Sequence, residues 1–369
     1  MTPGEKTFIV PVFIPHAGCP HRCAFCDQSA ITHVPSELPS PERLLPEIRK
    51  FLTYKKADRK TAQISFYGGN FLGLPADTVR DLLCMARQFV VSGAVDSLRF
   101  STRPDTITPE RLALLNDFPV ATVEIGLQSM NDRVLALSGR GHTAADTRRA
   151  VGLLREKGYE IGLQMMVGLP GDSTESALAT GREIVRLAPD FVRIYPTLVL
   201  ENSRLARWYR SGKYTPLPLA DAVSLVKRLC LMFTSAGIRV IRMGLQASET
   251  LDRGGVILAG PYHPAFGHLV CSEIFLDRAI ILLKSHSGPR YEIVLAVHPR
   301  SISEMRGLRN KNVEILRTMF NIRKLNILPD PSLSETDIRL RSGSGDSAET
   351  AVEQTDCIST TPGNGGRQV

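Results

Sequence analysis

Short apolar runs alternate along the chain with longer segments whose apolar residues recur at helical spacing. The runs are rich in Val, Ile and Phe and end at Gly, Pro or polar residues, which predicts buried strands. The predicted strands lie at residues 8–15, 62–67, 97–102, 121–127, 159–167 and 191–200. The segments between and after them predict helices at residues 41–54, 76–91, 109–116, 132–138, 143–157, 173–187 and 219–235.

A strand followed by a helix, repeated six times from residue 8, is typical of a parallel sheet with crossover helices. Such crossovers are almost always right-handed, and six units suit a partial barrel better than a flat sheet. We therefore expect an α/β fold, a partial (β/α)6 barrel of the TIM type. The active site of such a barrel lies at the carboxyl ends of its strands.

The pattern changes after a further predicted strand at residues 238–245, so the barrel domain is expected to span residues 1–246. A small α/β extension is predicted for residues 247–330, with a helix at 273–283, a strand at 291–297, a helix at 302–320 and a strand at 322–328. From about residue 331 the chain turns to Ser, Gly, Thr and acidic residues without periodicity. Residues 331–369 are therefore expected to form a disordered tail.

Composition and charge narrow the class of protein. Hydrophobic residues make up 43% and charged residues 22%, as in ordinary globular proteins. No apolar stretch reaches the roughly 18 residues of a membrane span, and residues 1–6 lack a signal-peptide pattern. We expect a cytoplasmic protein without a membrane partner. The net charge of +8 is compatible with an RNA or phosphate-bearing substrate, although a generic basic surface has the same signature.

Three of the seven cysteines gather in one loop, residues 16–28, directly after the first predicted strand. Cys19, Cys23 and Cys26 have the spacing C-x3-C-x2-C. In the cytosol such clustering indicates metal or redox chemistry. Three thiolates can hold three corners of a [4Fe–4S] cluster and leave one iron open for chemistry. A structural zinc or iron–sulfur module is the alternative, with His16 or His21 as a fourth ligand.

Unusual residues stand at the end of each of the other predicted strands, and the third ends in Ser-Thr-Arg-Pro-Asp at residues 101–105. Gly68, Gly69 and Asn70 follow the second, and two glycines allow a ligand to approach the backbone closely. Gln128 ends the fourth strand, with Arg140 soon after it. The fifth strand carries Gln164, and residues 168–171 follow it as Gly-Leu-Pro-Gly, while the sixth carries Arg193, Tyr195 and Pro196. Such residues at the end of one strand would indicate only a turn. Their recurrence at the ends of several strands favours a ligand-binding site.

These motifs resemble those of radical S-adenosylmethionine (SAM) enzymes. The cysteine motif with the aromatic Phe25 resembles the cluster signature of that superfamily, and residues 68–70 resemble its Gly-Gly-Glu motif. The stretches TRPD, GLQS, RGHT, GLPG and YPTLV, found between residues 102 and 199, look like the Elongator catalytic-subunit group. The resemblance covers residues 8–246, and oxygen-independent coproporphyrinogen oxidases share it more distantly.

The resemblance implies a mechanism. Cys19, Cys23 and Cys26 would ligate a [4Fe–4S] cluster, whose open iron would bind the amino and carboxylate groups of SAM. An external electron donor of the flavodoxin or ferredoxin type would drive SAM cleavage to a 5′-deoxyadenosyl radical, which abstracts hydrogen from a substrate. The implied SAM contacts are Gly68, Gly69, Asn70, Gln128, Arg140 and Gln164, with residues 167–170 near the adenine and Phe25 beside the cluster.

Three departures from the Elongator group leave the substrate unidentified. Ser101 stands where related enzymes often have Glu, and the cysteines are spaced more closely than in Elongator subunits. The residues after 246 are also too few for the acetyltransferase domain of that family. Its tRNA chemistry is therefore not transferred as a whole. The candidates are tRNA, a small metabolite and a protein side chain.

Overall fold

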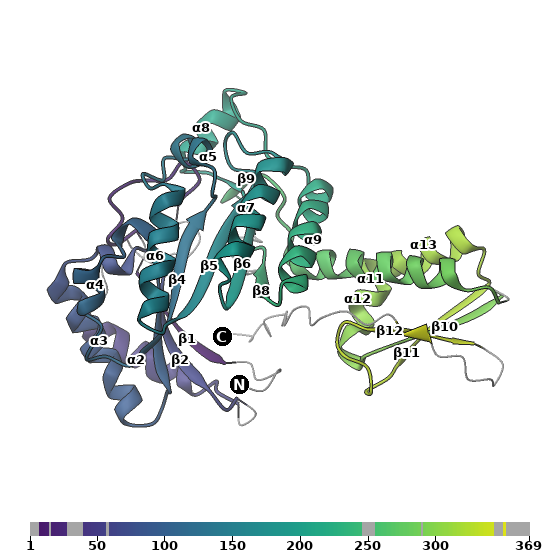
Figure 1. The fold of residues 1–369 in the computed structure, drawn as a ribbon, viewed down its shortest axis with the longest axis horizontal. Coiled ribbons are helices and arrows are strands. Elements are labelled where there is room, and N and C mark those ends of the chain that lie inside the picture. The colour runs from purple at the N-terminus through teal and green to yellow at the C-terminus, as the bar shows by residue number, and fades with distance from the viewer. Residues whose placement is uncertain are drawn as a thin grey trace. The chain divides into compact units, whose positions relative to one another are not determined.

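The computed structural model describes residues 7–14, 16–27, 40–56, 59–245, 255–288, 291–342 and 350–351. The chain divides into two compact units. The first contains residues 1–217 and 248–260, and the second contains residues 218–247 and 261–369. Colour along the ribbon in Figure 1 follows the chain from the strand–helix repeats of the first unit to the α/β extension of the second.

Six strands of the first unit lie in chain order within one sheet. They are β1 (Phe8–Phe13), β2 (Ala62–Tyr67), β3 (Ser97–Thr102), β4 (Val120–Gln128), β5 (Glu160–Val167) and β6 (Phe191–Pro196). Each neighbouring pair is parallel, with registers such as Phe8 opposite Ala62 in the first pair. The predicted parallel α/β fold is therefore confirmed.

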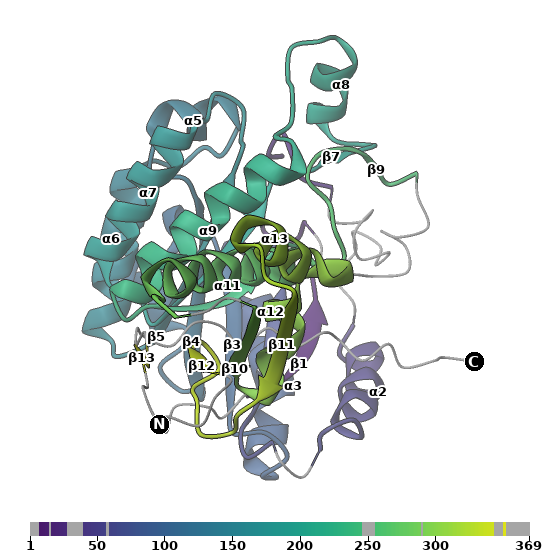
Figure 2. The ribbon, with the colours of Figure 1, turned by 90° about the vertical axis from the view of Figure 1, so that its right-hand side faces the viewer.

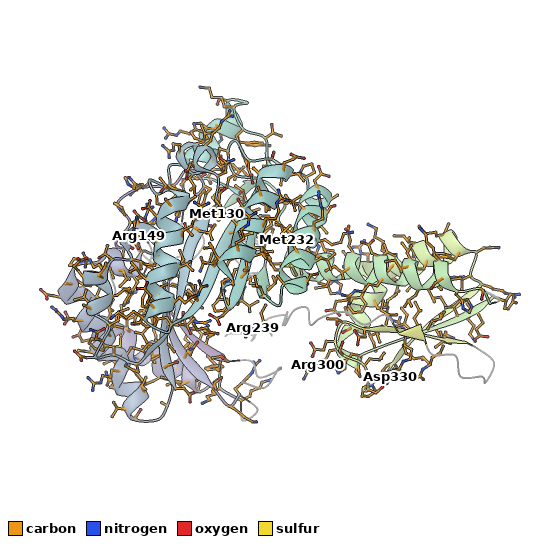
Figure 3. All side chains as sticks on the ribbon, viewed as in Figure 1. Met130, Arg149, Met232, Arg239, Arg300 and Asp330 are labelled. Carbon is orange, nitrogen blue, oxygen red and sulfur yellow. The ribbon has the colours of Figure 1, made fainter. Side chains whose placement is uncertain are left out.

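Helices connect these strands. They are α2 (Pro41–Leu52), α3 (Ala76–Val91), α4 (Pro109–Ala113), α5 (Asp132–Leu137), α6 (Ala144–Glu156), α7 (Thr174–Leu187) and α8 (Arg204–Arg210). Thr143 and Ser173 begin α6 and α7 with capping boxes, which satisfy amide groups of the first turn. Figure 2 shows α6 and α7 side by side. Arg149 of α6, labelled in Figure 3, pairs with the capping residue Asp146 at 2.7 Å.

The two faces of the strands differ in chemistry, as the two-residue period of a strand requires. One face carries an apolar core that includes a stack of Phe66, Phe71 and Phe100, with ring centroids 4.9 and 4.7 Å apart. Neighbouring residues on the same strands, such as Arg99 and Glu124, are charged and nonetheless buried. The sheet therefore has an apolar side for the helices and a polar side for the site.

The second unit is a helical layer on a four-stranded sheet. Its helices are α9 (Leu219–Ser235), α11 (Phe266–Ser285), α12 (Ile302–Arg306) and α13 (Lys311–Phe320). The strands of this sheet are β10 (Glu292–Val297), β11 (Lys324–Pro329), β12 (Ile338–Ser342) and β13 (Thr350–Ala351), whereas β8 (Arg239–Met243), in the same unit, does not belong to it. The sheet has the order β11-β10-β12-β13, and Leu282, Leu295 and Leu316 lie in the core between it and the helices.

Four sequence expectations need correction. The strand at 191–200 is two strands, because β6 ends at Pro196 and β7 (Val199–Leu200) pairs instead with β9 (Ile257–Ala259). The helix at 302–320 is broken at residues 307–310, where Gly307, Arg309 and Asn310 have positive φ. Helix α11 begins at Phe266 rather than at 273, and α8 was not expected.

The tail boundary at residue 331 is too early. Residues 338–342 form β12, whose Leu340 lies opposite Leu295 of the central strand β10. This pairing depends on a partner more than 40 residues away in the chain, and local composition does not report it. The tail after residue 351 lies outside the described residues. Among the described residues, none of the helices is both long and apolar enough to cross a membrane.

Candidate functional site

The cysteine loop follows β1 and is fixed at several points by backbone hydrogen bonds. The amide of Ala24 donates to Ser138 O at 2.8 Å, and the carbonyl of Ala24 accepts from Leu205 N of α8 at 2.8 Å. The loop begins with His16 and Gly18 in positive φ, which turns the chain back after the strand. Cys23 is buried, and Cys19 and Cys26 are half-buried. The thiols are therefore presented by a loop whose backbone is anchored on both sides.

Phe25 supports the loop from the side. Its ring packs against a small apolar cluster of Val199, Leu205, Ala206 and Tyr214. Because this cluster comes from β7 and the segment around α8, it joins the cysteine loop to the end of β6. The sequence predicted that Phe25 lies beside the iron–sulfur cluster. In the structure, its ring packs against this apolar group of side chains.

Gly69 lies against the backbone of the same loop. A Cβ on Gly69 would lie 2.5 Å from Ile14 O and closer still to Ala17 O, so only glycine fits. Gly68 has a φ of 101°, a conformation that side chains disfavour. The two glycines therefore let the turn after β2 pack directly on the turn after β1.

Asn70 ties three strand ends together and is fully buried. Its Nδ2 donates to Gly18 O at 2.8 Å, within the cysteine loop. Its Oδ1 accepts from Thr102 Oγ1, from the amide of Arg103 and from Thr106 Oγ1, at 2.7, 3.0 and 2.9 Å. Sequence reasoning expected only the backbone of this residue to act, and the side-chain role was missed.

Arg140 contacts Cys23, and the side chains of Gln128 and Arg140 both approach Gly126. A register shift between Gly126 and Gln128 and a φ of 62° at Gln128 re-aim the end of β4. Arg140 donates from Nη1 to Cys23 Sγ at 3.2 Å and from Nη2 to Gly126 O. Gln128 Oε1 and Arg140 Nε are buried without a hydrogen-bond partner. These two predicted residues therefore lie together at the cysteine loop with polar atoms left unsatisfied.

Opposing effects act on the Cys19 thiol, and their net result is a raised pKa. Burial raises the pKa of the Cys19 thiol, and nearby Cys23 raises it further, whereas Arg103 and Arg140 act to lower it. Arg103 also pairs with Asp105 at 2.9 Å and donates to the carbonyl of Arg140. Cationic groups thus lie close enough to the thiols to stabilise thiolates. The role of Arg103 was not predicted, although the TRPD stretch contains it.

His142 is a second residue that sequence reasoning did not single out. Burial and the cations Arg140 and Arg103 lower its pKa to about 3. One ring nitrogen, Nε2, lies 3.2 Å from Leu127 O, whereas Nδ1 is buried without a partner. The ring is therefore neutral at physiological pH.

Gln164 lies deeper in the barrel, within a buried charged network. Its Nε2 donates to Glu124 Oε2 at 2.8 Å and to Ser101 Oγ at 3.2 Å. Glu124 also pairs with Arg193 at 2.7 Å and with Arg99 at 3.5 Å. Burial alone would raise the pKa of Glu124, but the two guanidinium groups hold it below its usual value. Sequence reasoning placed Gln164 at the site but did not identify this network.

Among the residues that the structure describes, no group of three or more His, Cys, Asp or Glu side chains is gathered closely enough to hold a metal ion, and this includes the three cysteines of the loop. The ring of His21, one of the two histidines considered as a ligand, lies against Gly141. The cysteine loop is thus joined to the loop after β4 by this contact as well as by Ala24 and Arg140.

Two family models match most of the chain. Residues 13–184 match the Radical SAM superfamily, and residues 189–275 match the Radical_SAM C-terminal domain. A tRNA uridine(34) acetyltransferase of Dehalococcoides mccartyi is 28% identical over 246 residues, covering 56% of this chain and 52% of that protein. An uncharacterised protein of Methanocaldococcus jannaschii is 27% identical over 234 residues, covering 60% of this chain and 70% of that protein.

A solved structure, the archaeal Methanocaldococcus infernus Elp3 with an N-terminal deletion, has the same fold. The TM-score is 0.57 at 20% identity, covering 74% of this chain and 63% of that chain. The chain spans about half the length of the Dehalococcoides relative. The matched residues include the cysteine loop and the carboxyl ends of all six strands, so the barrel described above is that of a known enzyme class. The chain belongs to the radical SAM superfamily.

Proposed function

We propose that this enzyme binds a [4Fe–4S] cluster through Cys19, Cys23 and Cys26, binds SAM beside it, and acts on an RNA substrate, with tRNA as the first candidate. The observation that carries the cofactor proposal is the anchored three-cysteine loop with the Arg140 guanidinium on Cys23 Sγ at 3.2 Å. Hydrogen bonds to ligand sulfurs are a recognised feature of iron–sulfur sites.

The residues present fit both groups. Three cysteine thiolates are the donor set of a cluster that leaves one iron for another ligand. Beside them, Gln128 Oε1, Arg140 Nε and Arg103 Nη1 are buried and unsatisfied. Buried polar atoms without partners are costly, and a polar ligand would satisfy them. SAM carries amino, carboxylate and hydroxyl groups of the kind that these atoms bind.

When bound, the cluster would supply one electron to SAM, whose cleavage gives methionine and a 5′-deoxyadenosyl radical that takes a hydrogen atom from the substrate. Arg140 is the residue suited to the SAM carboxylate, because guanidinium and carboxylate pair in a bidentate manner. The backbone at Gly68, Gly69 and Asn70 would meet the amino group. Gln164 donates its amide hydrogens to Glu124 and Ser101, so a ribose hydroxyl would meet its carbonyl oxygen.

Apolar residues around the cysteine loop would exclude water from the proposed cofactor site. Phe25 and its apolar cluster cover one side of the cysteine loop. Residues 167–170 are proposed to line the adenine, and Leu169 among them is buried. The electron comes from an external donor of the flavodoxin or ferredoxin type, in the cytoplasm.

Two observations support an RNA substrate over a metabolite or a protein side chain. The relatives from Dehalococcoides mccartyi and Methanocaldococcus infernus bear the name tRNA uridine(34) acetyltransferase. The chain also carries a net charge of +8, which favours a polyanionic partner.

The cofactor proposal is tested on anaerobically reconstituted protein. Wild type should be brown, contain about four irons per chain and release 5′-deoxyadenosine with dithionite and SAM. Cys23→Ala should lose the colour and the product. Cys84→Ala changes an exposed cysteine on α3 and should keep both. A colourless wild-type protein that holds one zinc ion would refute the proposal.

The substrate proposal is tested in cells with and without the gene, by mass profiling of nucleosides from bulk tRNA. Loss of one modified nucleoside in the deletion strain, restored by wild type and not by Cys23→Ala, is the expected result. An unchanged nucleoside profile would contradict the RNA substrate while leaving the cofactor proposal intact.

A further inference from the structure

The second unit contains a module that the proposed function does not use. Strand β10 leads into α12, a four-residue loop follows, and α13 leads into β11, which pairs in parallel with β10. The loop, residues 307–310, has the sequence Gly-Leu-Arg-Asn and is called the GLRN loop below. The module is therefore β-α-α-β with a tetrapeptide between its two helices.

The base of the GLRN loop is fixed and its tip is exposed. Asn312 is buried, and its Nδ2 donates to Ser272 O on α11 at 2.8 Å. A Cβ on Gly307 would lie 2.8 Å from Asn312 Cγ, so glycine is required at the start of the loop. Leu308 nonetheless stays 47% exposed, and Arg309 and Asn310 beside it are exposed too. The loop is thus a firmly held projection with an apolar and a cationic tip.

The charge of this module is strongly one-sided. Residues 298–324 contain seven Lys or Arg and two Glu. Arg300, labelled in Figure 3, pairs with Glu335, and Lys324 pairs with Glu292. Arg306, Arg309 and Lys311, which flank and form the GLRN loop, are exposed and have no carboxylate partner in the described part of the chain. Unpaired cations therefore concentrate at the loop.

A second feature of the same module offers hydrogen-bonding groups. Strand β11 is an edge of the four-stranded sheet, so one row of its backbone amides and carbonyls has no strand partner. Lys324 and Leu328 on this strand are exposed. A ligand seated there would meet backbone groups and a cationic side chain.

We infer that the GLRN loop and the free edge of β11 form a binding site for single-stranded RNA. KH modules bind RNA with this arrangement, in which a Gly-x-x-Gly loop between two helices clamps four backbone nucleotides. The present loop ends in Asn310 instead of glycine, and Asn310 has a φ of 62°, which Asn tolerates better than most residues. The cations would meet phosphates, and the β11 edge would meet base edges.

This inference deepens the proposed RNA substrate by giving the chain a second region that binds it. A polyanion accounts for the unpaired cations, and splayed bases account for an exposed Leu308 and an open strand edge. An acidic extended peptide would use the same cations and the same strand edge, so tighter binding of such a peptide than of oligouridine would overturn the inference.

The test measures binding of a fluorescein-labelled 12-nucleotide oligouridine to the full chain by fluorescence anisotropy. The variant Leu308→Asp/Arg309→Asp should weaken binding at least about tenfold. The slope of log K against log salt should become shallower by about 0.7 for each phosphate that the variant no longer neutralises, the value for single strands. The control Arg87→Asp/Val91→Asp makes the same charge change at exposed positions of α3 and should bind like wild type.

A second variant guards against misfolding of the loop. Arg306→Gln/Lys311→Gln removes two exposed charges without touching the turn, and it should show the weaker binding and the smaller salt slope. Failure of wild type to bind oligouridine, equal weakening in the α3 control, or unchanged binding in both loop variants would overturn the inference. SAM cleavage without substrate is measured in parallel and should stay unchanged, so that failure of the cofactor proposal is seen separately.

Discussion

At the scale of single residues, Asn70 shows how one side chain can fix the cysteine loop to the ends of two neighbouring strands. Its amide nitrogen holds the carbonyl of Gly18, and its oxygen collects three donors from the end of β3. All four hydrogen bonds are used inside a fully buried site. The amide donates and accepts at once, which an ionised carboxylate of the same shape cannot do.

Asn70→Asp should release the cysteine loop. The carboxylate keeps the three accepted hydrogen bonds but faces Gly18 O with no hydrogen to donate, and an unsatisfied buried group costs about 1–3 kcal/mol. We expect fewer irons per chain after reconstitution and faster loss of the cluster colour in air. Asn116→Asp makes the same change at an exposed position and serves as the control. Equal iron content in both variants would contradict this role.

His142 gives the first unit a dependence on pH. Its pKa is about 3 in the folded protein, below the ordinary value of 6.5, so the unfolded chain binds a proton that the folded chain does not. The resulting stability is fully present above pH 6.5 and is lost as pH falls towards 3, by about 1.4 kcal/mol per unit.

His142→Gln should remove this dependence. Urea unfolding of the cluster-free protein, followed by fluorescence of the single tryptophan, Trp208 on α8, reports on the first unit. Between pH 7 and pH 5 wild type should lose about 2 kcal/mol more than the variant. A difference between the two proteins that is the same at both pH values would show that the ring does not titrate in this way.

At the scale of elements, the turns after β1 and β2 pack so closely that no side chain fits between them. Gly69→Ala would push a methyl group into the carbonyls of Ile14 and Ala17, both backbone atoms that cannot move aside without shifting the cysteine loop. We expect lower iron content and weaker binding of SAM, measured by equilibrium dialysis.

The control for this change is Gly152→Ala on α6. A Cβ there meets nothing within 4 Å, and alanine in a helix interior stabilises by up to about 1 kcal/mol relative to glycine. Its iron content should equal that of wild type. If Gly69→Ala also retained full iron, the close approach of the two turns would not be needed for the site.

How much of this could be read from the sequence differs between elements. The strands at 62–67 and 97–102 and the helices at 76–91 and 219–235 agree with their predicted bounds, because each has a strong apolar period ended by Gly, Pro or polar residues. The family motifs implied that Gln128 and Arg140 contact SAM, but the hydrogen bond from Arg140 to Cys23 was not predicted. The Asn70 bonds and the His142 environment were not predictable, since they depend on which strand ends become neighbours.

The helix break at residues 307–310 and the strand β12 were predicted least well. The kink at residues 307–310 occurs inside a continuous helical period. It depends on the buried Asn312, which packs against Gly307 and donates a hydrogen bond to Ser272 O. Strand β12 follows a segment of turn-forming residues and gains its structure from pairing with β10. In both cases a tertiary contact outweighs the local pattern.

At the scale of the whole molecule, the first unit is held together from inside by charge as well as by its apolar core. Glu124 on β4 is contacted by Tyr67 on β2, Arg99 on β3, Gln164 on β5 and Arg193 on β6. Five consecutive strands thus converge on one fully buried carboxylate. Such a network fixes the curvature of the strands below the site, because each partner must reach the same two oxygens.

Glu124→Gln should therefore destabilise the entire first unit rather than one strand. The amide removes the negative charge that compensates Arg99 and Arg193, and breaking a buried ion pair from one side costs about 3–5 kcal/mol. The urea midpoint followed by Trp208 fluorescence should fall, and the free energy of unfolding derived from it should drop by about 3–5 kcal/mol. Asp77→Asn breaks the exposed pair with Arg80 and should cost less than about 1 kcal/mol. Equal shifts in the two variants would mean that the interior charges contribute no more than a surface pair, and that the apolar face alone sets the barrel.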